Sequence, residues 1–168
     1  MQCCLSQDTS IIIKDEEGQI LHVNLGYFDP VIEEDSLEHS LSQFKVLTRA
    51  GWTELLSIGR RQLWEGEPLF HVKTRLGRLS LTGEQKLVVR RGVDEAILQA
   101  QELKAGDALL MRDPPKLGKK APLVNLEAQY RAYGVLSVDR TTGYLGYIYE
   151  IDTEDHTLVA NEFLVRCM

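Results

Sequence analysis

The chain has 168 residues, of which 43% are hydrophobic and 7% aromatic, and its formal net charge is −6 at pH 7. This length and composition predict one compact domain with a sizeable core. The acidic balance argues against a nucleic-acid partner, because proteins that bind phosphate backbones usually carry a basic face. The sequence has no apolar run long enough to span a membrane and no signal peptide, so no membrane partner is expected.

The cysteines are few and unevenly placed. Cys3 and Cys4 are adjacent, and Cys167 lies at the other end of the chain. This arrangement lacks the even, spaced pattern of a secreted disulfide scaffold. We therefore expect a cytoplasmic, reducing setting.

Turn signals and β-branched residues divide the first half of the chain into short strands. Residues 10–14 and 19–24 flank the charged turn 15–18, which predicts a hairpin. The acidic stretch 29–43 is consistent with a short helix or a loop. Further strands at hairpin spacing are expected at residues 44–48, 53–63, 68–76 and 78–82. Within the third of these, alternation predicts that His71 points outward rather than into a site.

The second half continues the β pattern with two expected helices. A helix is predicted over residues 97–103, ended by Gly106, and another over residues 124–132. The segment 112–122 contains three prolines and three lysines and is predicted to be a solvated loop. Strands are expected at residues 86–90, 108–111, 133–138, 143–151 and 156–165.

Cys4 lies at the start of this β-rich chain, ahead of the first predicted strand at residues 10–14. A thiolate is the strongest side-chain nucleophile at neutral pH, and it can attack the preceding carbonyl where the backbone is held in place and the oxygen is polarised. Taken alone, one cysteine near a terminus is more often a small buried hydrophobe. Other blocks of the sequence favour the interpretation of Cys4 as a nucleophile.

Four blocks occur in an order that resembles the inteins, the self-splicing elements of the Hint (hedgehog and intein) superfamily. They are CLSQDT at residues 4–9, TGEQ at 82–85, ELKAGD at 102–107 and IYEIDTEDHTLVANEFLV at 148–165. The resemblance covers nearly the whole chain. It implies an all-β, horseshoe-shaped Hint fold with pseudo-two-fold symmetry and one or two short helices. The loop at 112–122 lies where many inteins carry a homing endonuclease, which implies a mini-intein without one.

The resemblance assigns roles to individual residues. Cys4 matches the first splicing nucleophile, so residues 1–3 would be the upstream extein remnant, residues 4–167 the splicing domain and Met168 the downstream residue. Thr82 matches the threonine that positions and polarises the scissile amide. Glu150 stands where the family usually has an aspartate near the first thiol, and His156 matches the histidine that assists the C-terminal step.

Four positions depart from the family pattern. Gln85 replaces the motif histidine and cannot shuttle a proton. Arg166 replaces the penultimate histidine, Cys167 the terminal asparagine, and Met168 the second nucleophile. Shifting the register by one would make Cys167 the second nucleophile but would lose the ungapped match from His156, so the unshifted register is preferred.

Two functions of different class follow from the matches and the departures. The first is a single-turnover autocatalytic splicing element that acts by an N-to-S acyl shift at Cys4, with its C-terminal asparagine cyclisation absent or blocked. The alternative is a catalytically silent Hint-fold structural or binding module. The first implies flanking extein segments in cis as the only partners, a monomer and no cofactor.

The first function also requires the two ends of the chain to meet. Cys4 and Cys167 are expected to approach within about one to a few strand spacings. A disulfide from Cys167 to Cys4 or to Cys3 would then lock the nucleophile. Zinc bound by the cysteines and His156 would be expected to inhibit the reaction and not to act as a cofactor, because adjacent cysteines fit one tetrahedral site poorly.

Overall fold

Antiparallel β-strands make up nearly all the regular structure of the computed structural model, which describes residues 3–33, 43–113 and 130–167. The strands of its nine-stranded sheet, in spatial order, are β12 (Ser137–Thr141), β6 (Leu69–Lys73), β7 (Arg78–Thr82), β1 (Cys3–Ser6), β13 (Tyr147–Thr153), β5 (Gly51–Gln62), β4 (Lys45–Thr48), β2 (Ser10–Lys14) and β3 (Ile20–Asn24). The strands of its six-stranded sheet are β11 (Tyr130–Gly134), β10 (Ala108–Arg112), β15 (Phe163–Arg166), β8 (Lys86–Arg91) and β9 (Asp94–Gln99), with β14 (Thr157–Ala160) paired to β15.

Helical structure in the described part of the chain is limited to short pieces. The 3₁₀ turn η1 (Leu25–Phe28) leads into the helix α1 (Asp29–Glu33), and a second 3₁₀ turn, η2 (Ala100–Glu102), follows β9. None of the described helices is long and apolar enough to cross a membrane. The predicted all-β class with one or two short helices is confirmed.

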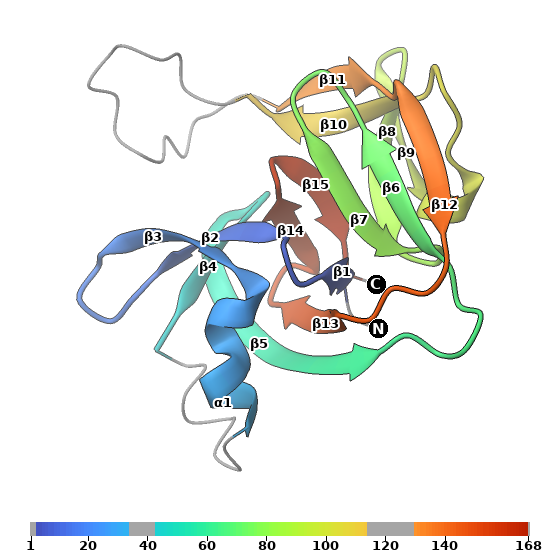
Figure 1. Ribbon diagram of the computed structural model, residues 1–168. Helices are drawn as coiled ribbons and strands as arrows, with labels where there is room; N and C mark the ends of the chain where they lie inside the picture. Colours follow the sequence, from blue (N-terminus) through green and yellow to red (C-terminus); the bar gives the residue numbers. More distant parts are fainter. Residues whose placement is uncertain (1–2, 34–42, 114–129, 168) are drawn as a thin grey trace.

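The long strand β5 gives the nine-stranded sheet its curl (Figure 1). Its first residues, 51–54, pair with β4, and residues 55–62 pair with β13, where the register shifts between Asp152 and Thr153. A bulge of this kind bends a strand and increases its twist. One strand thereby joins the β2–β3 hairpin to the centre of the molecule.

The two ends of the described chain lie close together in the middle of the fold, although the first strand β1 and the last strand β15 belong to different sheets (Figure 1). β1 pairs with β13 and β7, while β15 pairs with β8 and β10. Leu5, Leu81, Tyr149 and Phe163 are completely buried in one core cluster. Cys3 and Cys167 belong to the same cluster and are joined by a disulfide, so the prediction that the two ends meet is confirmed for the described residues.

The predicted helix over residues 97–103 is wrong. Residues 94–99 form β9, which pairs with β8 along its whole length, and only the 3₁₀ turn η2 follows. The segment has good helix formers, but its pairing with the preceding strand β8 overrides this local helix preference. The second predicted helix, 124–132, is also wrong for residues 130–132, which belong to β11, and its residues 124–129 lie outside the described residues.

Two predicted closing strands are each divided. Asn161 and Glu162 have φ angles of 49° and 69°, and this left-handed pair turns the chain from β14 into β15. The predicted strand 133–138 is broken at Val135 and Leu136, whose amides donate to Asp107 and Lys73 as the chain crosses between sheets. Of the acidic stretch 29–43, residues 29–33 are helical and residues 34–42 lie outside the described residues, as do residues 114–122 of the predicted loop.

Candidate functional site

β1 places Cys4 at the centre of the nine-stranded sheet. Cys4 is opposite Glu150 in the β1–β13 ladder, and Leu5 is opposite Leu81 of β7. Because side chains alternate along a strand, Cys3 and Leu5 point into the core while Cys4 points to the other face. The Cys4 side chain is half-buried and lines a pocket of about 490 Å³.

This pocket, which we call the Cys4 pocket, brings together five of the seven residues that the sequence nominated. They are Cys4, Thr82, Gln85, Glu150 and Arg166. The pocket is also lined by residues that the sequence analysis missed, among them Arg61 near the end of β5 and Trp64 and Glu67 in the connection from β5 to β6. Motif spacing gives no signal for these three, because the family blocks include neither β5 nor that connection.

A tight turn sets Thr82 and Gln85 beside Cys4. The Gln85 amide donates to the Thr82 carbonyl across the turn, at 3.2 Å. Gly83 is required in this turn, because a β-carbon there would lie 2.8 Å from the Phe70 ring and 2.9 Å from the side chain of Gln101. The TGEQ block is therefore a structural unit that fixes two pocket side chains at once.

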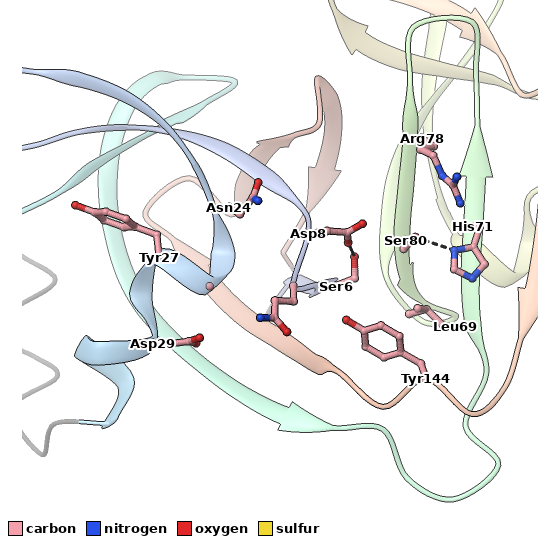
Figure 2. A pocket seen from close by; sticks show the side chains of 12 residues that line it. Ser6, Asp8, Asn24, Tyr27, Asp29, Leu69, His71, Arg78, Ser80 and Tyr144 are labelled. Atoms are coloured by element: carbon pink, nitrogen blue, oxygen red, sulfur yellow. Dashed lines mark hydrogen bonds between the residues drawn. The ribbon is translucent and has the colours of Figure 1, made fainter.

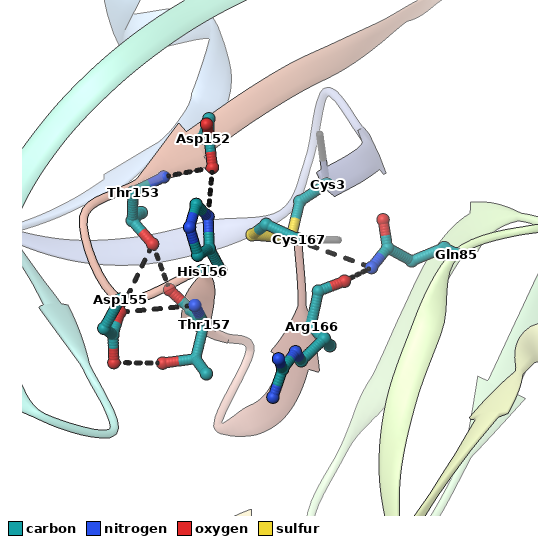
Figure 3. Close-up of polar contacts among 9 residues, drawn as sticks. All are labelled: Cys3, Gln85, Asp152, Thr153, Asp155, His156, Thr157, Arg166 and Cys167. Atoms are coloured by element: carbon teal, nitrogen blue, oxygen red, sulfur yellow. Dashed lines mark hydrogen bonds and ion pairs between the residues drawn. A yellow bond between two sulfur atoms is a disulfide. The ribbon is translucent and has the colours of Figure 1, made fainter. Parts of the chain in front are cut away.

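Gln85 connects the two ends of the chain (Figure 3). Its Oε1 accepts a hydrogen bond from the Cys4 backbone amide, and its Nε2 donates to the Arg166 carbonyl at 2.8 Å. Nε2 also donates to the Lys86 carbonyl at 3.0 Å and lies 3.7 Å from the Cys3 sulfur. The side chain is almost fully buried. One side-chain amide thus hydrogen-bonds backbone groups beside both predicted splice junctions. An amide can donate and accept hydrogen bonds but does not take up or release a proton.

The environment of Cys4 keeps its thiol protonated at neutral pH. Burial is the main cause that raises the pKa of Cys4, and the nearby Glu150 carboxylate raises it further. The Arg61 guanidinium and a hydrogen bond with the Thr82 side chain act in the opposite direction. The net effect is a raised pKa, so attack by this sulfur requires a group that removes its proton.

Arg61 is a fixed cation in the Cys4 pocket. It makes a bidentate ion pair with Glu67, at 2.9 and 3.0 Å, and its guanidinium lies 4.4 Å from the centre of the Trp64 ring. The ion pair raises the pKa of Arg61 and lowers the pKa of Glu67. The two hydrogen bonds to Glu67 fix the position of the Arg61 guanidinium, which keeps its positive charge near the Cys4 sulfur.

The remaining two nominated residues, His156 and Cys167, lie at the C-terminal end of the fold (Figure 3). His156 occupies the turn after β13 with a φ of 60°, and its Nδ1 lies 3.1 Å from the Asp152 carboxylate. The backbone carbonyl of His156 accepts a hydrogen bond from the Cys167 amide at 2.8 Å. His156 and Cys167 do not line the Cys4 pocket, and Cys167 is connected to it through the preceding residue, Arg166.

A disulfide joins Cys3 to Cys167, with 4.3 Å between the two α-carbons. Of the two pairings that the sequence left open, the structure has the one that leaves Cys4 outside the disulfide. Both bonded cysteines are completely buried. Among the described residues, no group of three or more His, Cys, Asp or Glu side chains is arranged to hold a metal ion.

A second pocket, of about 700 Å³, lies away from these residues (Figure 2). It is lined by Ser6, Asp8, His71, Arg78 and Tyr144, among others. Here His71 does not point freely outward as predicted, because its ring nitrogens lie 2.7 Å from the Ser80 hydroxyl and 2.8 Å from the Thr141 hydroxyl. None of the nominated splicing residues lines this pocket.

No protein-family model matches the sequence, and no curated protein matches it significantly. Solved structures do match the fold. The Mvu transcription factor IIB mini-intein has a TM-score of 0.76 at 14% identity, with 98% of this chain and 99% of that chain covered. An intein from a hyperthermophile also gives 0.76 at 14% identity, covering 97% and 98%, and the PabCDC21-1 intein gives 0.74 at 15% identity over the full length of both chains. At these identities the comparison establishes a shared fold over the entire chain.

Proposed function

We propose that this chain, which has the fold of the inteins, is a protein-splicing element whose first step is an N-to-S acyl shift at Cys4. The observation that carries the proposal is the position of the Cys3–Cys4 peptide bond. Its nitrogen is held by Gln85, and the Cys4 thiol on the same residue lines a pocket with Thr82 and Glu150. The reacting atoms and the groups that assist them all come from one chain, so the reaction needs no partner other than the flanking segments.

In this step the Cys4 sulfur attacks the carbonyl carbon of Cys3. A carbon–sulfur bond forms, the carbon–nitrogen bond breaks, and the thiol proton passes to the departing nitrogen, which becomes the free amino group of Cys4. Glu150, directly opposite Cys4 in the ladder, is the carboxylate placed to carry that proton. Arg61 and Thr82 stabilise the thiolate that forms on the way.

Gln85 binds the departing nitrogen but limits the rate. Its Oε1 accepts a hydrogen bond from the nitrogen both in the peptide and in the amine product, which keeps the leaving group in place. An amide cannot supply a proton to that nitrogen, whereas an imidazole can. We therefore expect a slow first step compared with a site that carries histidine at this position.

The second half of splicing stops at Cys167. Release at the C-terminal junction requires a side-chain amide nitrogen that closes a ring on its own carbonyl, and a cysteine has none. Arg166 meets Gln85 through its backbone carbonyl, and a guanidinium can donate hydrogen bonds but has no acceptor with which to move a proton. The expected product is an upstream segment carried as a thioester on Cys4.

The test uses the full chain with a folded partner protein fused before Met1. Added thiol should release the partner, because it reduces the disulfide and intercepts the thioester, and without thiol the fusion should stay intact. The Cys4→Ala variant is the matched control and should release nothing. A folded wild-type chain that retains its partner after prolonged incubation with thiol would favour the alternative, a silent Hint-fold module in which Gln85 and the disulfide serve only stability.

A further inference from the structure

The Cys3–Cys167 disulfide spans the peptide bond that the proposed first step breaks. Cys3 is the last residue before that bond, and Cys167 lies 164 residues further along, inside the domain. The segment that ends in Cys3 is therefore attached to the domain twice, once through the Cys3–Cys4 linkage and once through sulfur.

We propose that this disulfide makes release of the upstream segment conditional on two independent reactions, acyl transfer at Cys4 and reduction at Cys3–Cys167. The proposal rests on the function proposed above and adds a redox requirement to its product. Acyl transfer alone leaves the upstream segment bound to Cys167 through sulfur. Reduction alone leaves it bound to Cys4 through the peptide or thioester bond.

Each reaction balances with reagents of a defined class. A nucleophile attacks the Cys3 carbonyl carbon of the thioester, its bond to that carbon replaces the bond to the Cys4 sulfur, and Cys4 recovers its proton. A dithiol or phosphine supplies two electrons to the disulfide, which with two protons gives the thiols of Cys3 and Cys167, while the reductant is oxidised.

The two bonds differ in their access to solvent. Cys4 is half-buried at the wall of an open pocket, whereas Cys3 and Cys167 are completely buried in the core cluster. A small nucleophile therefore reaches the thioester in the folded protein more readily than a reductant reaches the disulfide. In a compartment that keeps thiols reduced the second condition is already met, and in an oxidising one the upstream segment stays attached.

The experiment uses the chain itself, purified under air, because its residues 1–3 precede the Cys3–Cys4 bond. It is treated with hydroxylamine, which cleaves thioesters without reducing disulfides, with a phosphine, with both, or with neither. The intact mass is then measured under denaturing, non-reducing conditions. We expect loss of the residue 1–3 peptide only with both reagents. Hydroxylamine alone should add its own mass and remove nothing.

The Cys3→Ser variant separates the two conditions. It lacks the tether, so hydroxylamine alone should now release the peptide, to the same extent as both reagents release it from the wild type. Its fold is checked by circular dichroism, and the wild-type arms stand on their own if the variant does not fold.

Two results would overturn the proposal, and they differ from each other. Release by hydroxylamine alone from a wild-type chain whose Cys4 is the single alkylatable cysteine would show that the disulfide does not retain the segment, while leaving the proposed function intact. No release in any arm, from wild type or from folded Cys3→Ser, would show that the acyl shift itself is absent, and the redox requirement would fall with it.

Discussion

At the scale of single residues, the proposed chemistry depends on how the charged groups of the Cys4 pocket shift the pKa of the Cys4 thiol. Glu150 and Arg61 act on the same sulfur in opposite directions, and burial adds to the effect of Glu150. The sequence located Glu150 because it stands inside a family block. Arg61 had no such marker, since its position beside Cys4 depends on pairing between β5 and β13, which are about ninety residues apart in the sequence.

The balance of charge predicts the pH dependence of Cys4 alkylation in the oxidised chain, where the other two cysteines are bonded. A raised pKa means that the thiolate fraction at neutral pH is small and rises about tenfold per pH unit, with a midpoint above the ordinary thiol value of about 8.5. Glu150→Gln removes a like charge and should lower the midpoint. Arg61→Gln removes an opposite charge and should raise it.

Glu84→Gln is the matched control for these variants. Glu84 also lines the Cys4 pocket but is not among the groups that shift the Cys4 pKa, so its midpoint should equal the wild-type value. Iodoacetamide labelling followed by mass spectrometry gives each curve. A wild-type midpoint below the ordinary thiol value would contradict the assigned environment.

The second residue-scale prediction concerns Gln85. Replacing it with histidine puts a group that can hold and release a proton at the departing nitrogen, and such a group typically contributes about 10²- to 10⁴-fold, or roughly 2.7 to 5.4 kcal/mol of barrier. We expect Gln85→His to accelerate thiol-dependent release by a factor in this range.

Gln101→His serves as the control for Gln85→His, because Gln101 lines the same pocket but its side chain donates to Gln99, whereas the Cys4 amide is bound by Gln85. Release rates are compared by mass spectrometry on the reduced chains. Equal rates for wild type and a folded Gln85→His variant would mean that the nitrogen is not the group that limits the step.

At the scale of elements, the sequence predicted strands best where local turns define them. The β2–β3 hairpin followed from its charged turn, in which the Asp15 carboxylate accepts hydrogen bonds from the amides of Glu17 and Gln19. β9 was missed because its strand state comes from the β8 ladder rather than from its own residues. The β14–β15 turn was missed because two consecutive non-glycine residues in left-handed conformation have no reliable sequence signal.

The next prediction concerns cleavage at the C-terminal junction, which follows the β14–β15 hairpin. Cys167→Asn with Cys in place of Met168 and a short downstream segment should recover slow C-terminal cleavage, since asparagine supplies the missing amide nitrogen. Adding Arg166→His should speed it by supplying a proton carrier. The hairpin already fixes residue 167, whose amide donates to the His156 carbonyl.

Cleavage of the downstream segment is followed by mass spectrometry, with Cys167→Ala in the same background as the control. Because these variants lose the disulfide, their fold is checked first. An intact junction in the well-folded triple variant would mean that the region around His156 no longer holds the scissile bond in a reactive geometry.

At the scale of the whole molecule, the resemblance predicted the all-β class, the meeting of the termini and a possible link between them. It did not predict which pairing forms. Cys3 was treated as part of an upstream remnant, but strand alternation turns it into the core beside Cys167 while Cys4 faces the pocket. The orientation of two adjacent residues therefore decided which of them, Cys3 or Cys4, is bonded to Cys167.

The same disulfide predicts a large effect on stability. It closes a loop with a sequence separation of 164 residues, and the chain-entropy relation gives up to about 5 kcal/mol for a loop of this length. Cys3→Ser should lower the free energy of unfolding by about 2 to 5 kcal/mol in urea titrations. A phosphine should destabilise the wild type and leave Cys3→Ser unchanged, and equal midpoints for oxidised wild type and Cys3→Ser would contradict this role.

The most direct test of the acyl shift identifies the bond that breaks. After thiol treatment of the reduced chain fused to an upstream partner, both products are sequenced and weighed. We predict a domain that begins with Cys4 bearing a free amino group and a partner that ends in a Cys3 thioester, with neither product from Cys4→Ala. Cleavage at any other bond, or the same products from Cys4→Ala, would contradict the assignment of Cys4 as the nucleophile.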